Sequence, residues 1–185
     1  MKNKETDRFF IAIVPEEPVF HDLHQFKLEA ATHFSTSGAL KSPPHLTLHM
    51  PFLWKKKKLN QLKTTISNFA SQETGFEIEL NNFNQFPPRV IFVDVKQSME
   101  LSNLQTKLKK MMKRELNLFN ADYKERPFRP HFTIAFRDLK KAIFPEAWNF
   151  FKEKQYTQTI QVKYITLLKH DGNVWEVYEK FHFDG

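Results

Sequence analysis

Apolar positions in the first part of the chain predict a strand, a helix and a second strand. Residues 9–14 form an uninterrupted apolar run of strand length that ends before a proline. Over residues 19–34, apolar side chains recur at intervals of three and four, which is typical of one face of a helix. Residues 45–52 follow two prolines and are predicted to form the second strand.

The next region continues with a helix and a strand that has one polar face. Apolar residues at helical spacing predict a helix over residues 59–69, with Gly75 marking the end of this region. Apolar side chains alternate with glutamates in residues 76–80, as in a strand with one solvent-exposed face. Residues 81–88 are predicted to form a loop.

The order strand, helix, strand then occurs a second time. Residues 90–95 predict a buried strand, residues 101–115 a helix, and residues 120–129 a polar loop before a strand that begins at His131. Corresponding elements of the two halves keep nearly the same separation along the chain. We infer an internal duplication at the level of the fold.

The end of the chain predicts a short helix over residues 144–154 and a hairpin. The arms of the hairpin are residues 157–169 and 174–183, and the turn contains Asp171 and Gly172. Strands combined with three or four helices indicate an α/β or α+β protein.

Two short segments are near copies of each other. Residues 44–48 have the sequence Pro-His-Leu-Thr-Leu, and residues 130–134 have the sequence Pro-His-Phe-Thr-Ile. Successive side chains in a strand point to opposite faces, so each segment is predicted to present its histidine and its threonine on one face. The opposite face is predicted to enter the core through Leu46, Leu48 and Met50 in the first strand and through Phe132, Ile134 and Phe136 in the second.

Composition narrows the classes of protein to consider. The chain has 185 residues, of which 41% are hydrophobic, and this length suits one globular domain. It contains no cysteine, which excludes disulfides, thiolate metal sites and a cysteine nucleophile. A net charge of +7 favours anionic partners such as phosphates or nucleic acid. The charged start of the chain and the lack of a long apolar run predict a cytoplasmic protein without a membrane segment.

The paired segments resemble the two-histidine (2H) phosphoesterase superfamily, which includes 2′-5′ RNA ligases and cyclic phosphodiesterases. The resemblance rests on residues 45–48 and 131–134, is supported by residues 8–15 and 89–93, and so covers nearly the whole chain. It implies an α+β, bilobal fold of duplicated β-α-β units with pseudo-twofold symmetry, in which antiparallel sheets form a central cleft. It also implies catalysis without a metal or other cofactor. We expect residues 1–185 to form a single bilobal domain and to act as a monomer.

The residue types in the paired segments suit the cleavage of a phosphodiester. One proton must leave the attacking oxygen and another must reach the leaving oxygen, and imidazole, with an ordinary pKa of about 6.5, can do either near neutral pH. His45 and His131 are therefore the candidate general base and general acid, in an order that the sequence leaves open. Thr47 and Thr133 supply hydroxyl donors for the non-bridging phosphate oxygens.

The expected activity is hydrolysis of 2′,3′-cyclic phosphates or of 2′-5′-linked nucleotide or RNA ends. Because reversal exchanges the roles of the two histidines, the same site could also join such ends. The alternative is a non-catalytic RNA- or nucleotide-binding protein that retains the cleft. Binding alone does not require two titratable groups, each with a hydroxyl beside it, so the intact pair favours the enzyme.

Three arginines are candidates for binding the substrate. Arg137 has the same strand parity as His131 and Thr133, and it is predicted to reach phosphate from that face. Arg126 and Arg129 precede the same strand in a loop, where each either contacts phosphate or is a solvated charge.

Two further positions have competing interpretations. Phe9 or Phe10 stacks on a base, as aromatic side chains do in single-stranded RNA sites, or packs in the core. His49 is predicted to share a face with His45, but four residues of a strand span about 13 Å, which is too far for two ligands of one zinc ion. We therefore expect no metal ligands.

Overall fold

The computed structural model describes residues 5–119 and 127–185. The first half of the chain contains two strands and two α-helices, with short 3-10 turns, η1 and η2, before β2 and α2. The elements are β1 (Thr6–Ile13), α1 (Val19–Phe34), η1 (Gly38–Lys41), β2 (Leu46–Lys55), η2 (Lys56–Lys58) and α2 (Leu59–Ala70).

The second half repeats this order after one additional strand and ends in three strands. Its elements are β3 (Phe76–Phe86), β4 (Val90–Val95), α3 (Met99–Leu116), β5 (His131–Ala135), α4 (Phe144–Lys152), β6 (Thr157–Val162), β7 (Tyr164–His170) and β8 (Trp175–His182). Local sequence determines the ends of α3, because the Ser98 side chain accepts a hydrogen bond from the Leu101 amide at its start. Asn117 adopts a left-handed conformation at its end, with φ 56°.

The strands form two four-stranded sheets, and every pairing within them is antiparallel. The strand order is β2-β1-β7-β8 in the first sheet and β5-β4-β3-β6 in the second. The unit β1-α1-β2-α2 therefore corresponds to β4-α3-β5-α4, and each motif strand lies at the edge of its own sheet. The α+β fold with two duplicated halves is confirmed.

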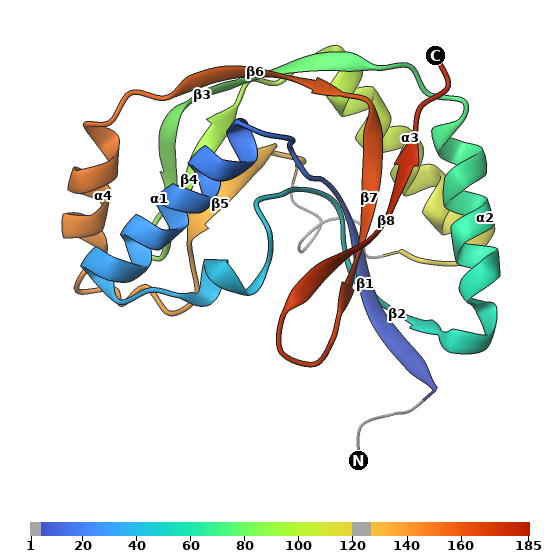
Figure 1. The fold of residues 1–185 in the computed structure, drawn as a ribbon, viewed down its shortest axis with the longest axis horizontal. Coiled ribbons are helices and arrows are strands. Elements are labelled where there is room, and N and C mark those ends of the chain that lie inside the picture. Colours follow the sequence, from blue (N-terminus) through green and yellow to red (C-terminus); the bar gives the residue numbers. More distant parts are fainter. Residues whose placement is uncertain (1–4, 120–126) are drawn as a thin grey trace.

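Each sheet is covered by one helix from each half of the chain (Figure 1). Helix α1 follows β1 of the first sheet but packs on β5 of the second, beside α4, which packs on β3. Helix α3 follows β4 of the second sheet but packs on β2 of the first, beside α2. This exchange supports the proposal that residues 1–185 act as one bilobal domain. No helix in the described ranges 5–119 and 127–185 is long and apolar enough to span a membrane.

Two sequence-based boundaries were wrong. Strand β3 continues to Phe86 through the predicted loop over residues 81–88, because its second part pairs with β4 from Phe83 onwards. The predicted first arm of the hairpin divides at Lys163 into β6, which belongs to the second sheet, and β7, which belongs to the first. Strand propensity does not reveal such a change of sheet, because both segments have the same local pattern.

Both motif strands contain a β-bulge one residue after the threonine. Ile11 pairs with His49 and Ala12 with Thr47, which leaves Leu48 as the extra residue of β2. In β5 the extra residue is Ile134, because Ile91 pairs with Ala135 and Phe92 with Thr133. An extra residue reverses the side-chain parity beyond it.

The bulges change which side chains enter the core. His49 and Ala135 are fully buried, whereas Met50 and Phe136 line the cavity described below. The prediction that Met50 and Phe136 pack in the core was therefore wrong, as was the prediction that His49 shares a face with His45. The other predicted core residues, Leu46, Leu48, Phe132 and Ile134, are buried.

Candidate active site

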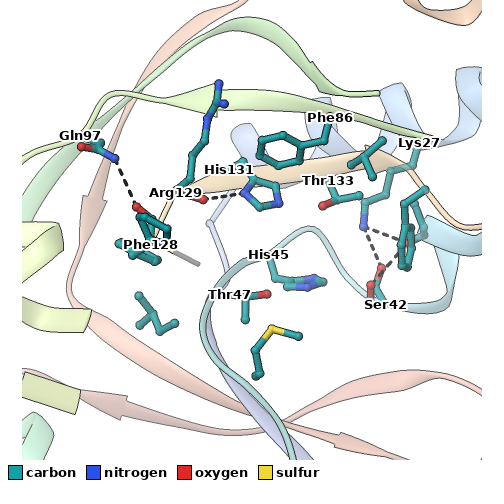
Figure 2. A pocket seen from close by; sticks show the side chains of 16 residues that line it. Lys27, Ser42, His45, Thr47, Phe86, Gln97, Phe128, Arg129, His131 and Thr133 are labelled. Carbon is teal, nitrogen blue, oxygen red and sulfur yellow. Dashed lines mark hydrogen bonds between the residues drawn. The ribbon is translucent and has the colours of Figure 1, made fainter. Parts of the chain in front are cut away.

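A cavity of about 710 Å³ lies between the two motif strands. His45, immediately before β2, and Thr47 line it from the first sheet, while His131 and Thr133 on β5 line it from the second. Figure 2 shows these four side chains around the same space. The two segments, far apart in sequence, thus present two imidazoles and two hydroxyls to a single cavity.

The two imidazoles are held by equivalent hydrogen bonds. Nδ1 of His45 lies 2.8 Å from the Pro43 carbonyl oxygen, and Nδ1 of His131 lies 2.7 Å from the Arg129 carbonyl oxygen. A carbonyl oxygen can only accept, so Nδ1 of each ring carries a proton. In the neutral ring, Nε2 is then the unprotonated nitrogen and is available to accept a proton in the cavity.

A phenylalanine ring supports each imidazole. The Phe10 and His45 rings have centroids 4.8 Å apart and planes inclined at 53°. The Phe92 and His131 rings have centroids 4.9 Å apart and planes inclined at 54°. Both phenylalanines are buried, so the hydrogen bond and the ring contact together restrict the orientation of each histidine.

The charges around the two histidines differ. Burial, followed by the positive charge of Lys27, lowers the pKa of His45 to about 3. Burial and the positive charge of Arg129 also lower the pKa of His131, while its hydrogen bond to the Arg129 carbonyl oxygen and the negative charge of Asp94 partly oppose this lowering. His45 is thus biased more strongly towards the neutral state, whereas His131 has a carboxylate nearby that favours its protonated state.

Asp94 and Arg129 form a polar group beside His131. Asp94 accepts a hydrogen bond of 2.8 Å from Asn84 Nδ2, and a carboxylate oxygen lies 3.6 Å from the Arg129 guanidinium. The guanidinium also lies over the Phe86 ring, 4.9 Å from its centroid. It lies over the Phe92 ring as well, 5.4 Å from its centroid, so Arg129 lines the cavity as a cation held by one carboxylate and two aromatic faces.

Aromatic side chains form much of the remaining wall. Phe86, Phe128 and Phe136 line the cavity together with the four motif side chains. Aromatic rings with a few polar groups at defined positions are typical of pockets for organic ligands, and this volume falls in the usual range for such pockets.

Sequence comparison assigns the chain to a family of known proteins. The sequence profile of the 2′-5′ RNA ligase superfamily matches residues 15–174. The chain belongs to this superfamily. A relative from Geobacillus sp. (strain WCH70), named "Putative phosphoesterase", is 24% identical over 182 residues, which is 96% of this chain and 97% of the relative. Membership and this relative support assignment as a phosphoesterase.

Solved structures with the same fold match almost the entire chain. TT0787 of Thermus thermophilus has a TM-score of 0.66 and 21% identity, with 96% of this chain and 98% of that chain covered. LigT of E. coli, in complex with 3′-AMP, has a TM-score of 0.65 and 19% identity, with 98% and 100% covered. At these identities the likeness shows the fold.

Phe9 and Phe10, which the sequence offered as substrate-binding residues, lie in the core. Phe9 and Phe10 are 1% and 3% exposed. Phe9 packs against Phe52 and Tyr178, and Phe10 packs beneath His45. Neither lines the cavity, so the expectation that one of them stacks on a base is corrected to core packing.

The three arginine candidates have different outcomes. Arg129 lines the cavity, and Arg126 lies outside the described residues. Arg137 lies beyond the end of β5 with a left-handed φ of 60°, so its predicted parity with His131 and Thr133 was wrong. Its guanidinium lies over the Phe136 ring, 5.0 Å from the centroid, and a contact with phosphate stays a prediction.

Two charged residues beside the histidines were missed by sequence reasoning. Lys27 interrupts the apolar stripe of α1 between Leu23 and Ala30, and a lysine in a buried stripe is a signal that could have been used. Asp94 has a weaker signal, a single carboxylate near the end of an apolar strand. Its proximity to His131 depends on the pairing of β4 with β5, which the sequence pattern does not specify.

Proposed function

We propose that the protein is a phosphodiesterase that uses His45 and His131 as general base and general acid. Its substrates would be 2′,3′-cyclic phosphates or 2′-5′-linked nucleotide or RNA ends. One observation carries this proposal: both imidazoles line one cavity, each with Nδ1 tied to a carbonyl oxygen and a threonine hydroxyl nearby. Two such groups can remove and supply the two protons that phosphodiester cleavage requires.

The lining of the cavity supports a nucleotide as the substrate class. Bases and riboses can lie against aromatic rings such as Phe86 and Phe128, while the cationic Arg129 attracts phosphate. Crystal structures of E. coli LigT contain 3′-AMP, phosphate and ATP. By analogy with that protein, we infer that this cavity also holds a nucleotide, with the reacting phosphorus between the two histidines.

The electrostatic difference between the histidines suggests their roles. Burial and the nearby Lys27 cation lower the pKa of His45 to about 3, so its ring is neutral at physiological pH, which is the state that a general base requires. Burial lowers the pKa of His131 as well, but Asp94 opposes this lowering, so His131 is the candidate acid of the pair. Binding of an anionic phosphate between them would further favour protonation of His131, because opposite charges stabilise each other.

The reaction is a net addition of water. Nε2 of His45 takes a proton from water while the water oxygen forms a bond to phosphorus. The bond from phosphorus to the leaving ribose oxygen breaks, and that oxygen takes a proton from Nε2 of His131. Thr47 and Thr133 donate hydrogen bonds to the non-bridging oxygens, where charge develops. Joining of a 2′,3′-cyclic end follows the same steps with a ribose hydroxyl in place of water. His45 takes the proton of this hydroxyl as its oxygen bonds to phosphorus, one ring bond of the cyclic phosphate breaks, and the released oxygen takes a proton from His131.

The competing proposal is a nucleotide- or RNA-binding protein without catalysis. A protein that only binds nucleotides could use cations such as Arg129 and the aromatic wall of the cavity, and it would not need two titratable imidazoles with a hydroxyl beside each. Their paired arrangement is therefore better explained by proton transfer.

The decisive experiment is a substrate panel with identification of the products. Purified protein is incubated with 2′,3′-cyclic nucleotides and with 2′-5′-linked and 3′-5′-linked dinucleotides, with and without EDTA. We expect hydrolysis of the first two classes that persists in EDTA. His45→Ala and His131→Ala should each lower kcat by about 10²- to 10⁴-fold and leave binding of inorganic phosphate largely intact.

A matched control is His21→Ala, which removes an exposed imidazole from α1 outside the cavity. This variant should keep full activity. If no member of the panel is cleaved although nucleotides bind, the binding protein is the correct interpretation. Equal loss of binding and turnover in both cavity variants would lead to the same conclusion.

A further inference from the structure

Lys27 is a buried cation in the wall of the cavity. Its side chain extends from α1, the residue is 2% exposed, and it lines the same cavity as His45 and His131. Nζ donates hydrogen bonds to two carbonyl oxygens, that of Ala39 at 3.1 Å and that of Ser42 at 3.0 Å. Figure 2 shows Lys27 with its bond to Ser42 at the edge of the cavity.

The charge of Lys27 has no carboxylate partner. Among the described residues no Asp or Glu forms an ion pair with it, and its two hydrogen bonds go to neutral carbonyl groups. Burial of an unpaired ammonium group is unfavourable, because the group loses its hydration without gaining an opposite charge. A bound anion would offset this cost, because it would supply the missing opposite charge.

One N–H donor of the Lys27 ammonium group is also available. A protonated lysine has three N–H groups, and the Ala39 and Ser42 carbonyl oxygens take two of them. The third has no protein acceptor within residues 5–119 and 127–185. The positive charge of Lys27 also acts on His45, which places it close to that ring.

We propose that Lys27 is an anion-binding residue of the active site. Its third N–H binds a non-bridging oxygen of the phosphate that lies between His45 and His131. This inference rests on the proposed function for the position of the phosphate, but not for the ability of the cavity to bind an anion. The Ala39 and Ser42 carbonyl oxygens hold Nζ in place, so the donor is already oriented before the anion arrives.

The protonation state of Lys27 fits this role. Burial lowers the pKa of Lys27 to about 7. The neutral amine has only two N–H groups, which the two carbonyl groups occupy, so it has no donor left for an anion. Bound phosphate should therefore raise the pKa of Lys27 above this value.

The competing explanation is purely structural. Lys27 joins α1 to η1 through its bonds to Ala39 and Ser42, and this connection alone could account for its presence. A structural lysine would change stability when replaced but would leave the affinity for anions unchanged in a folded variant.

The first test compares Lys27→Met with Lys41→Met. Methionine approximates the length of the lysine side chain without its charge, and Lys41 is an exposed residue of η1 that does not line the cavity. Binding of inorganic phosphate is measured by calorimetric titration at a pH below about 7, where Lys27 is protonated. Lys27→Met should weaken phosphate binding by about tenfold or more, whereas Lys41→Met should bind like the unmodified protein. Equal affinity in a folded Lys27→Met variant overturns the proposal.

The second test uses the unmodified protein, so it does not depend on the folding of a variant. The Lys27 side-chain resonances are titrated with pH by NMR, without and with saturating phosphate. An increase of the Lys27 pKa in phosphate is expected, and an unchanged pKa overturns the proposal. Negative results in these binding tests would overturn only the role of Lys27, whereas a substrate panel without cleavage would overturn the proposed reaction.

Discussion

Asp94 lies directly opposite His131 in the pairing of β4 with β5, and its carboxylate opposes the lowering of the pKa of this histidine by burial. We predict that Asp94→Asn lowers the pKa of His131, because the amide has no negative charge to favour the protonated ring. If His131 is the general acid, less of it is protonated near neutral pH, and kcat should fall by about tenfold. NMR titration of the imidazole and the pH profile of kcat measure these effects.

Asp7→Asn is the control for the Asp94 variant. Asp7 is a partly buried carboxylate of β1 that pairs with Lys169 at 2.8 Å, outside the cavity. Its replacement should leave the His131 titration unchanged. If the pKa of His131 is the same in Asp94→Asn as in the unmodified protein, the Asp94 carboxylate has no influence on the candidate acid.

Thr47→Val and Thr133→Val should each reduce kcat while leaving the fold intact. Valine has nearly the same shape as threonine, but it cannot donate a hydrogen bond to a non-bridging oxygen. Loss of one such donor typically costs about 10²- to 10³-fold in kcat. Steady-state kinetics with a 2′,3′-cyclic nucleotide measure this loss.

Thr64→Val on α2 is the control for the two threonine variants. Thr64 is exposed and does not line the cavity, so the same replacement there should leave kcat unchanged. Thr36 is less suitable for this purpose, because its hydroxyl donates a hydrogen bond to Asp138. Unchanged kcat in both Thr47→Val and Thr133→Val would remove the hydroxyls from the proposed mechanism.

The stability of the protein should increase as the pH rises above about 7 because of Lys27. The unfolded chain keeps the Lys27 proton up to the ordinary pKa of 10.5, whereas the folded chain releases it at about 7. Between these values the unfolded state binds more protons, so the free energy of unfolding rises with pH, by at most about 1.4 kcal/mol per pH unit. Lys27→Met should flatten this rise, as measured by urea denaturation across the interval.

Neighbouring groups do not produce the same slope. His24, His45 and His131 have pKa values below the ordinary 6.5, so they are already neutral in this interval. The measurements should stop below pH 10.0, the ordinary pKa of Tyr156 and Tyr164. An equal slope in the unmodified protein and in Lys27→Met would contradict this prediction.

Asp138 connects the end of β5 to the segment that positions Lys27. Its carboxylate accepts hydrogen bonds from the Thr36 hydroxyl at 2.7 Å and from the amides of Ser37 and Gly38, each at 2.9 Å. Asp138→Ala should lower the free energy of unfolding by about 1 kcal/mol, a modest value because solvent screens this exposed group. It should also weaken phosphate binding, since η1 contains one of the carbonyl groups that hold Lys27. Chemical denaturation and phosphate titration test the two effects, and an unchanged affinity would separate Asp138 from the anion site.

The sequence was sufficient for most of the fold because local patterns repeat. Helix α1 has the predicted bounds, and the two Pro-His-φ-Thr-φ segments, where φ is apolar, do line one cavity. The alternation of side chains along a strand correctly predicted that His131 and Thr133 lie on one face. Beyond Thr133 this prediction was wrong, because a bulge depends on the pairing between strands and the local sequence pattern does not reveal it.

The same limit explains the residues that sequence reasoning missed. Lys27 reaches the cavity because α1 packs on β5 of the opposite sheet, and no periodicity within α1 predicts its partner sheet. Asp94 meets His131 across a strand pair, and Phe86 lies in a strand that was predicted as a loop. Each of these positions is determined by contacts between distant segments.

Because α1 and α3 each pack on the sheet of the other half, the positions of the two histidines depend on both halves of the chain. The strand that begins after His45 packs against α3, and the strand that begins at His131 packs against α1, so each half of the polypeptide supports the histidine of the other. Neither half can shift as a rigid body without disturbing the support of both rings. The spacing between the two imidazoles is thereby protected from independent movement of the lobes, and a fragment containing only one half would lack the helix that supports its own histidine.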